Sequence, residues 1–294
     1  MKIKLLLAAV SLVGLALPLR SAPLNESTFT EVVKDVNVIS GADKTTVPAT
    51  INNLFKSPDI VRTGPDSRAE MTSADQTVIR VGANSVFSFE AAGRNLDLEQ
   101  GSVLFHPPAG AGGGTIKSGG SAAAVLGTTL IVTATRDGGF KVIMLEGKGT
   151  VTLSDGKSVT LKAGQMVFVL PGGTTFSSVL DINLEKLAAN SQLIHGFSHE
   201  LSSLLLIQKA IDAQNAAIAS GQTVDTGILA DQFINPPGQG NGFGSLDPGS
   251  YQVAAPQPLS GLQSGNPGGR GFTSENGPVS TPPSAPVGKQ FGGP

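Results

Sequence analysis

Two histidines in the C-terminal half of the chain have a spacing that could bind a metal. His195 and His199 are four residues apart, and Glu200 adjoins them. On a helix, this spacing places two imidazoles on one face, as in many zinc sites. However, Gly196 lies between the histidines and is expected to interrupt a helix there, and no third ligand stands at a comparable spacing. We therefore interpret both as structural histidines and expect no metal site.

Three further motifs suggest nucleophilic or phosphate chemistry. Ser154-Asp-Gly-Lys157 has the Ser-x-x-Lys spacing of penicillin-recognising enzymes, and Lys117-Ser-Gly119 is similar to their Lys-Thr-Gly element. Their order is reversed, and the Ser-Asp-Asn element is missing. Gly110-Ala-Gly-Gly-Gly114 lacks the Gly-Lys-Ser/Thr of a phosphate loop. We predict a hairpin turn at 154–157, an insertion loop around 110–114, no catalytic residue and no cofactor.

Two glutamates occupy matching positions in a repeated Leu-Glu-(x)-Gly element. Glu99 and Glu146 could pair for acid–base catalysis or could bind calcium, since both functions require neighbouring carboxylates. Polar residues also occur at strand ends without any reactive role. We favour this second interpretation and expect the two glutamates to be structural.

The composition narrows the classes of ligand. The 294 residues have a formal net charge of −2, only 14% are charged, and neither Cys nor Trp occurs. This balance provides no electrostatic footprint for nucleic acid. Without Cys no disulfide is possible. The single tyrosine is Tyr251, so aromatic platforms for stacking sugars are missing and only weak recognition of carbohydrate is expected.

The elements that would position these residues are mainly strands. From Ile60 to Leu170, short runs of Val, Ile, Phe and Thr are separated by single glycines, and apolar and polar residues alternate at period two, for example in Phe87-Ser-Phe89. The turn positions that we expect are Gly64, Gly82, Gly101, Gly127, Gly147 and Gly164. Their spacing of 17 to 26 residues favours a small parallel β-helix or a β-roll, whose coils stack on one another. An antiparallel sandwich with glycine at its corners would look much the same, so both architectures stay open.

The N-terminus has the anatomy of a secretory signal peptide, which we assign to residues 1–22. Lys2 and Lys4 precede Leu5 to Leu19, an uncharged run of 15 residues. This run is shorter than the roughly 20 apolar residues that cross a bilayer. We expect export to the periplasm, the cell surface or the medium, and no membrane span after cleavage. The alternative is an uncleaved membrane anchor.

The chain changes character after about residue 173. Between residues 181 and 220, apolar residues recur at helical spacing, for example Leu187, Ile194 and Leu201, which predicts one or two amphipathic helices. We expect this stripe to pack on the chain's own sheet, although a partner could cover it instead. Residues 235–294 are rich in Gly and Pro and cannot bury enough apolar surface to fold, so we predict a disordered tail.

A set of short segments, in order, resembles the FecR domain family over roughly residues 30–173. The segments are Val61–Gly64, Ser67–Met71, Ile79–Ser85, Leu96–Gly101, Val125–Thr128, Val142–Gly147 and Val159–Gln165. The residues that carry the match are Arg62, Thr63, Arg80, Asn84, Ser85, Glu99, Thr128, Glu146 and Gln165. The resemblance implies an extracytoplasmic, mainly β recognition domain of β-helix-like character without known catalysis. The family is best known in inner-membrane regulators that relay the state of an iron-siderophore receptor to a sigma factor.

The resemblance leads to one main functional hypothesis. Those regulators have a cytoplasmic sigma-binding region and a membrane span before the domain, and we do not recognise either in this sequence. We therefore expect a non-catalytic binding module of the bacterial cell envelope, whose partner is another envelope protein or a surface polymer. The alternatives are a membrane-anchored regulator of a sigma factor and a secreted structural or polysaccharide-associated surface protein. The sequence leaves the oligomeric state open.

Overall fold

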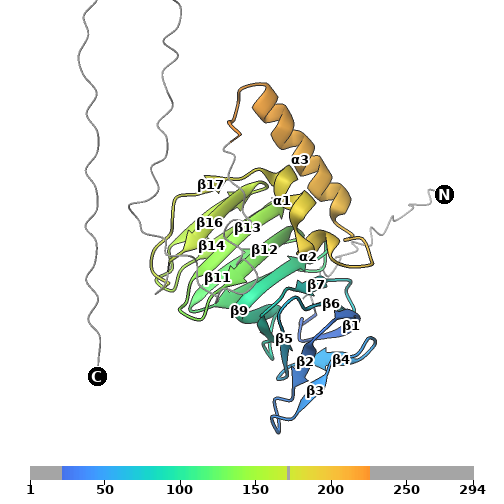
Figure 1. Cartoon of the computed structure of the whole chain (residues 1–294). Coiled ribbons are helices and arrows are strands. Elements are labelled where there is room, and N and C mark those ends of the chain that lie inside the picture. Colours follow the sequence, from blue (N-terminus) through green and yellow to red (C-terminus); the bar gives the residue numbers. More distant parts are fainter. Residues whose placement is uncertain (1–21, 171–172, 226–294) are drawn as a thin grey trace, which may run out of the picture. The chain divides into compact units, whose positions relative to one another are not determined.

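A computed structural model describes residues 22–170 and 173–225 as a mainly β structure with three helices (Figure 1). The mainly β class with a few helices agrees with the sequence prediction. The predicted signal peptide (residues 1–22, apart from Ala22) and the predicted disordered tail (residues 235–294) lie outside the described residues. None of the helices in the described ranges is long and apolar enough to cross a membrane.

The strands form two sheets that share one long strand, β9. The first, which we call the helix-covered sheet, has the order β4 (Leu54–Lys56), β1 (Glu26–Val33), β6 (Arg68–Thr72), β7 (Val78–Val81), β9 (Asn95–His106), β12 (Thr129–Ala134), β13 (Phe140–Glu146), β16 (Gln165–Val169) and β17 (Leu180–Asp181). The second, which we call the open sheet, has the order β3 (Thr46–Pro48), β2 (Val36–Ile39), β5 (Ile60–Thr63), β8 (Val86–Phe89), β9, β10 (Gly114–Ser118), β11 (Ser121–Val125), β14 (Lys148–Thr152) and β15 (Ser158–Lys162).

Strand β9 joins the two sheets because it bends at Gly101. Residues before the glycine pair with β8 and β10, and residues from Gly101 onward pair with β12 and β7. Gly101 has a φ of +93°, in the region that favours glycine. It therefore lies inside a strand, whereas Gly64, Gly82, Gly127, Gly147 and Gly164 lie in connections between strands.

The chain alternates between the sheets as it proceeds. The hairpin β10–β11 belongs to the open sheet, β12–β13 to the helix-covered sheet, and β14–β15 to the open sheet again. Among the described strands, every pair is antiparallel except β9–β10. The alternation of hairpins between the sheets is typical of a β-roll, whereas the strand pairing is that of an antiparallel two-sheet structure. The described strands do not form the continuous parallel stack of a parallel β-helix.

The apolar residues form two clusters on opposite faces of the helix-covered sheet. Between the sheets, Phe29, Phe55, Phe87 and Phe89 pack with ring centroids 5.3–6.1 Å apart. On the outer face, strand residues such as Ile143 pack against the helices. Alternation at period two thus places apolar side chains on both faces of this sheet.

The predicted helical stripe packs on the chain's own sheet, as expected. Leu187 on helix α1 (Leu184–Asn190), Ile194 on α2 (Gln192–His195) and Leu201 in the segment before α3 (Leu204–Ala219) are buried against the outer face of the helix-covered sheet. Helix α2 ends at Gly196, its C-cap, where the sequence predicts an interruption. Figure 1 shows the three helices gathered on one side of the strands.

The bend of β9 provides a stability test. A Cβ at Gly101 would overlap Ser85, whereas a Cβ at Gly156 would meet nothing within 4 Å, although φ is +85° there. We expect Gly156→Ala to cost about 1 kcal/mol of unfolding free energy through backbone strain alone. Gly101→Ala should cost about 3 kcal/mol or more, because overlap adds to strain. Urea unfolding of both variants measures the difference, and equal losses would show that the bend does not depend on close packing.

Candidate functional site

Several residues of the family match meet at one corner between the two sheets. The Thr63 hydroxyl donates to the Gly82 carbonyl at 2.6 Å and accepts from the Ser85 amide at 2.9 Å. The Ser85 hydroxyl accepts from the Ser102 amide at 3.0 Å and lies 2.9 Å from the Gly82 carbonyl. Both hydroxyls are buried and bonded to the main chain. They hold the corner and are not available as nucleophiles.

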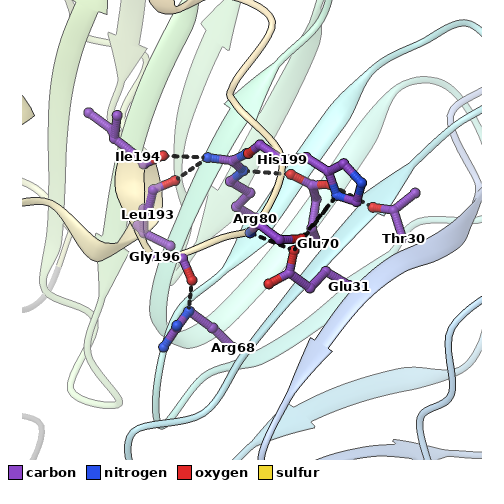
Figure 2. A network of polar contacts seen from close by, with 10 residues as sticks. Thr30, Glu31, Arg68, Glu70, Arg80, Leu193, Ile194, Gly196 and His199 are labelled. Atoms are coloured by element: carbon purple, nitrogen blue, oxygen red, sulfur yellow. Dashed lines mark hydrogen bonds and ion pairs between the residues drawn. The ribbon is translucent and has the colours of Figure 1, made fainter.

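Arg80, from the same match, lies on the outer face of the helix-covered sheet and is fully buried (Figure 2). Its Nε donates to Glu70 Oε2 at 2.7 Å. Its Nη1 donates to the carbonyls of Leu193 and Ile194 at 3.1 and 2.7 Å, and its Nη2 donates to the His199 carbonyl at 2.7 Å. The last carbonyls of a helix have no N–H partner within the helix. The Arg80 guanidinium supplies donors to two such carbonyls at the end of α2.

Further contacts surround this arginine clamp, which we define as Arg80, Glu70, Arg68 and the segment 193–199. The Phe197 ring lies against both guanidinium groups, with its centroid 4.5 Å from Arg80 Cζ and 5.6 Å from Arg68 Cζ. Arg68 donates to the Gly196 carbonyl, and Thr30 donates to Glu70 at 2.8 Å. The clamp therefore connects β1, β6 and β7 to the helical segment.

Glu31 extends the clamp toward solvent. Its carboxylate accepts from the Ser198 amide at 2.8 Å and from the Ser198 hydroxyl, and His199 Nδ1 lies 3.7 Å away. Partial burial opposes ionisation of Glu31, but the Ser198 hydrogen bonds and the nearby His199 and Arg68 outweigh it and lower the carboxyl pKa. This carboxylate stays ionised and fixes the loop after α2.

A second polar group is buried where β9, β12 and β13 meet. His106 Nδ1 lies 2.9 Å from the Thr129 hydroxyl, which donates to Glu146 Oε1 at 2.8 Å. The only hydrogen of the Thr129 hydroxyl is used in the hydrogen bond to Glu146. The Thr129 oxygen therefore accepts a hydrogen bond from His106, whose Nδ1 carries the hydrogen. Burial lowers the pKa of His106 and raises that of Glu146. The three side chains satisfy one another in the interior.

The remaining residues of the family match lie apart. Glu99 is exposed on the open-sheet part of β9, whereas Glu146 is buried in the helix-covered sheet, so the two do not form an acid–base or calcium site. Arg62 is exposed on β5. Gln165 donates to Asp181 and accepts from the Lys162 amide, which ties β16 to its neighbours.

Two positions of the match are defined by backbone contacts. Asn84 has a φ of +52°, and its carbonyl accepts from the Gln100 side chain at 2.9 Å. Thr128 is buried, and a Cβ added at Gly147 would overlap its methyl group. Both positions shape connections between strands.

The sequence motifs with possible chemistry are not assembled into a site. His195 and His199 are exposed on either side of the α2 C-cap, and the described ranges hold no group of three or more His, Asp or Glu suited to a metal ion. Lys157 binds Asp155 within the hairpin turn between β14 and β15, at 2.7 Å. Residues 110–113 belong to the connection 107–113 between β9 and β10, and Gly114 is the first residue of β10.

Sequence reasoning missed several of the buried polar partners. Glu70 lies within a matched segment without being one of the residues that carry the match, and His106, Thr129 and Arg94 belong to no motif of the sequence. Arg94 is buried and pairs with Asp75 at 2.7 Å. A charged residue within an apolar strand segment, such as Glu70 between Ala69 and Met71, is the signal that could have identified a buried pair.

One end of the structure carries an apolar surface, which we call the tip. Val47 on β3, Leu54 on β4 and Ile51 between them are each more than half exposed. Beside them is a pocket of about 210 Å³, lined mainly by apolar side chains that include Phe29 and Val38. The strands β3 and β4 are the terminal strands of the two sheets, so the pocket opens where both sheets end.

Comparisons with known proteins identify part of the chain. Residues 59–150 match the family model described as "FecR protein". Two crystal structures of a "putative anti-sigma factor" from Parabacteroides distasonis ATCC 8503 are similar, with 17% and 16% identity and a TM-score of 0.39 for each. The similarity covers 44% and 46% of this chain and 63% and 64% of theirs, less than two thirds of their length. No curated protein matches the sequence.

The two arginines of the match provide a direct test of the clamp. Arg80→Met would leave Glu70 buried without its cation, so we expect a loss of about 3 kcal/mol or more in unfolding free energy. Hydrogen exchange should also accelerate in residues 184–219. Arg62→Met, at an exposed position, should change stability by less than about 0.5 kcal/mol. Similar effects of the two substitutions in urea unfolding would contradict this role of Arg80.

The buried histidine should make stability depend on pH. In the unfolded chain the imidazole protonates near pH 6.5, whereas folded His106 resists protonation, so stability falls as pH drops below about 6.5. Glu146 acts in the opposite sense, because its raised pKa adds stability at low pH that is lost as pH rises. His106→Gln should therefore lose less stability than the wild type between about pH 7.5 and pH 5.5, by up to about 1 kcal/mol. His195→Gln is the control and should behave as the wild type does. If the stability of His106→Gln fell with pH as steeply as that of the wild type, His106 would not be the source of the pH dependence.

Proposed function

Because the chain carries a FecR domain, we propose that it acts as a non-catalytic binding module of the bacterial cell envelope, and that its partner is another envelope protein. The strongest support is that polar residues of the match form hydrogen bonds inside the domain and are not exposed to a partner. Thr63, Arg80, Ser85 and Glu146 are buried and bonded within the domain. These residues stabilise the fold, so we expect exposed side chains to bind the partner.

The tip is the surface best suited to contact a protein. Val47, Ile51 and Leu54 expose apolar area next to a pocket, and exposed apolar patches of this kind are common at protein interfaces. The pocket is large enough for one large apolar side chain of a partner. Each of the terminal strands β3 and β4 pairs with only one other described strand, so its outer edge could bind an extended segment.

Export is the second part of the proposal. Its support is the sequence of residues 1–22, with Lys2 and Lys4 before the uncharged run Leu5–Leu19. The alternative is a regulator that stays anchored in the inner membrane through the same run and relays a signal to a sigma factor. A secreted, polysaccharide-associated surface protein is a further alternative. N-terminal sequencing of the protein from the native envelope decides between cleavage and anchoring.

The tip can be tested with matched leucine variants. Leu54→Asp places a charge in the tip, and Leu205→Asp places the same charge on α3, where Leu205 is 78% exposed. Because both leucines are exposed, neither change should shift the urea midpoint appreciably. We expect Leu54→Asp to reduce cross-linking to the envelope partner at least about tenfold, as for a central interface residue, and Leu205→Asp to leave it unchanged.

The outcome of this comparison is read by quantitative mass spectrometry of cross-linked envelope fractions. Equal cross-linking by the wild type and both variants would exclude the tip as the contact surface. Absence of any protein cross-linked above the level of an unrelated exported protein would contradict the proposed function.

A further inference from the structure

The outer face of the open sheet carries an ordered grid of nine side chains that no helix covers. Strands β11, β14 and β15 pair in register, with Ala122 opposite Thr152 and Thr152 opposite Ser158 in one row, and Ala124 opposite Thr150 and Thr150 opposite Thr160 in the next. The third row contains Leu126, which follows β11, and the pair Lys148 and Lys162. Alternate residues of a strand share a face, so the eight residues on these strands point to the same side, and Leu126 lies directly after β11 at the end of its row.

The two lysines of the grid are directly opposite each other and are not neutralised. Lys148 pairs with Lys162 across β14 and β15, and both are exposed. Neither ammonium group forms an ion pair or hydrogen bond within residues 22–170 and 173–225. Like charges directly opposite in a sheet are destabilising. An anion bound between them would remove this repulsion.

The rest of the grid is flat and rich in hydroxyl groups. Thr150, Thr152, Ser158 and Thr160 are at least partly exposed, and their hydroxyls make no hydrogen bond within the described ranges. Ala122 and Ala124 continue both rows with short side chains. Each hydroxyl can donate and accept, so the four side chains could exchange hydrogen bonds with sugar hydroxyls. Leu126 is 74% exposed and can pack against the apolar face of a sugar ring.

The geometry points to a binding site for an acidic polysaccharide on this grid, with carboxylates at Lys148 and Lys162 and sugar hydroxyls along the Thr and Ser rows. Charge complementarity favours an anionic ligand, and the four free hydroxyls favour a sugar polymer over a lipid surface, which would require more apolar side chains than Leu126. This site lies on other strands than the tip. It goes beyond the proposed function, and purified protein tests it whether or not the tip binds a protein.

The experiment measures binding of fluorescently labelled polygalacturonate to the purified protein without its signal segment. We expect affinity to fall as salt rises from about 0.02 M to about 0.5 M, because screening weakens exposed charge pairs. Lys148→Glu/Lys162→Glu should bind at least about tenfold more weakly. Lys186→Glu/Lys209→Glu is the matched control, since it makes the same charge change at exposed residues of α1 and α3, and it should bind as the wild type does.

Two further comparisons separate a sugar site from general attraction to polyanions. Thr150→Val/Thr160→Val removes two hydroxyls but keeps shape and charge, and it should weaken binding to polygalacturonate severalfold while binding to polyphosphate stays the same. Fully methyl-esterified polygalacturonate should not bind. Equal loss in the Lys186→Glu/Lys209→Glu control, or tighter binding to anionic phospholipid vesicles that also requires Lys148 and Lys162, would overturn the proposal.

Discussion

A single buried positive charge determines how the helices attach to the strands. Transfer of a guanidinium group out of water costs several kcal/mol or more unless its N–H groups find acceptors. Glu70 neutralises Arg80, and three carbonyls of residues 193–199 accept its remaining hydrogen bonds. These carbonyls lie 113 to 119 residues further along the chain. The helical segment therefore takes the position in which this charge is satisfied, and apolar packing of Ile194 and Leu201 completes the attachment.

The bend of β9 has a similar role between the two sheets. Because β9 belongs to both sheets, its bend sets their relative position, and the hydroxyls of Thr63 and Ser85 fix the corner next to it. Only a glycine at position 101 leaves space for Ser85. The corner contains Thr63 and Ser85 of the match and the arginine clamp contains Arg80, whereas Glu146 belongs to the separate buried group with Thr129 and His106.

The surfaces that remain differ in chemistry. The tip presents apolar side chains and a pocket at the ends of two sheets, whereas the outer face of the open sheet presents hydroxyls and two lysines that form no ion pair within the described residues. The helix-covered sheet has no free outer face in its centre, because α1, α2 and α3 occupy it. Within the described residues, the tip, the outer face of the open sheet and the outer side of the helices are therefore the surfaces left exposed.

Local features of the structure followed from the sequence alone. Alternation at period two identified strands, Asp155-Gly156 identified the β14–β15 hairpin, and the helical stripe with its interruption at Gly196 was correctly placed. These features depend on neighbouring residues, whose preferences are visible in the chain. Strand pairing could not be read in this way, because the same alternation fits a parallel coil or an antiparallel sheet. The partners of Arg80 and His106 were equally hidden, since only the tertiary structure brings distant donors and acceptors together where water is excluded and each must be paired.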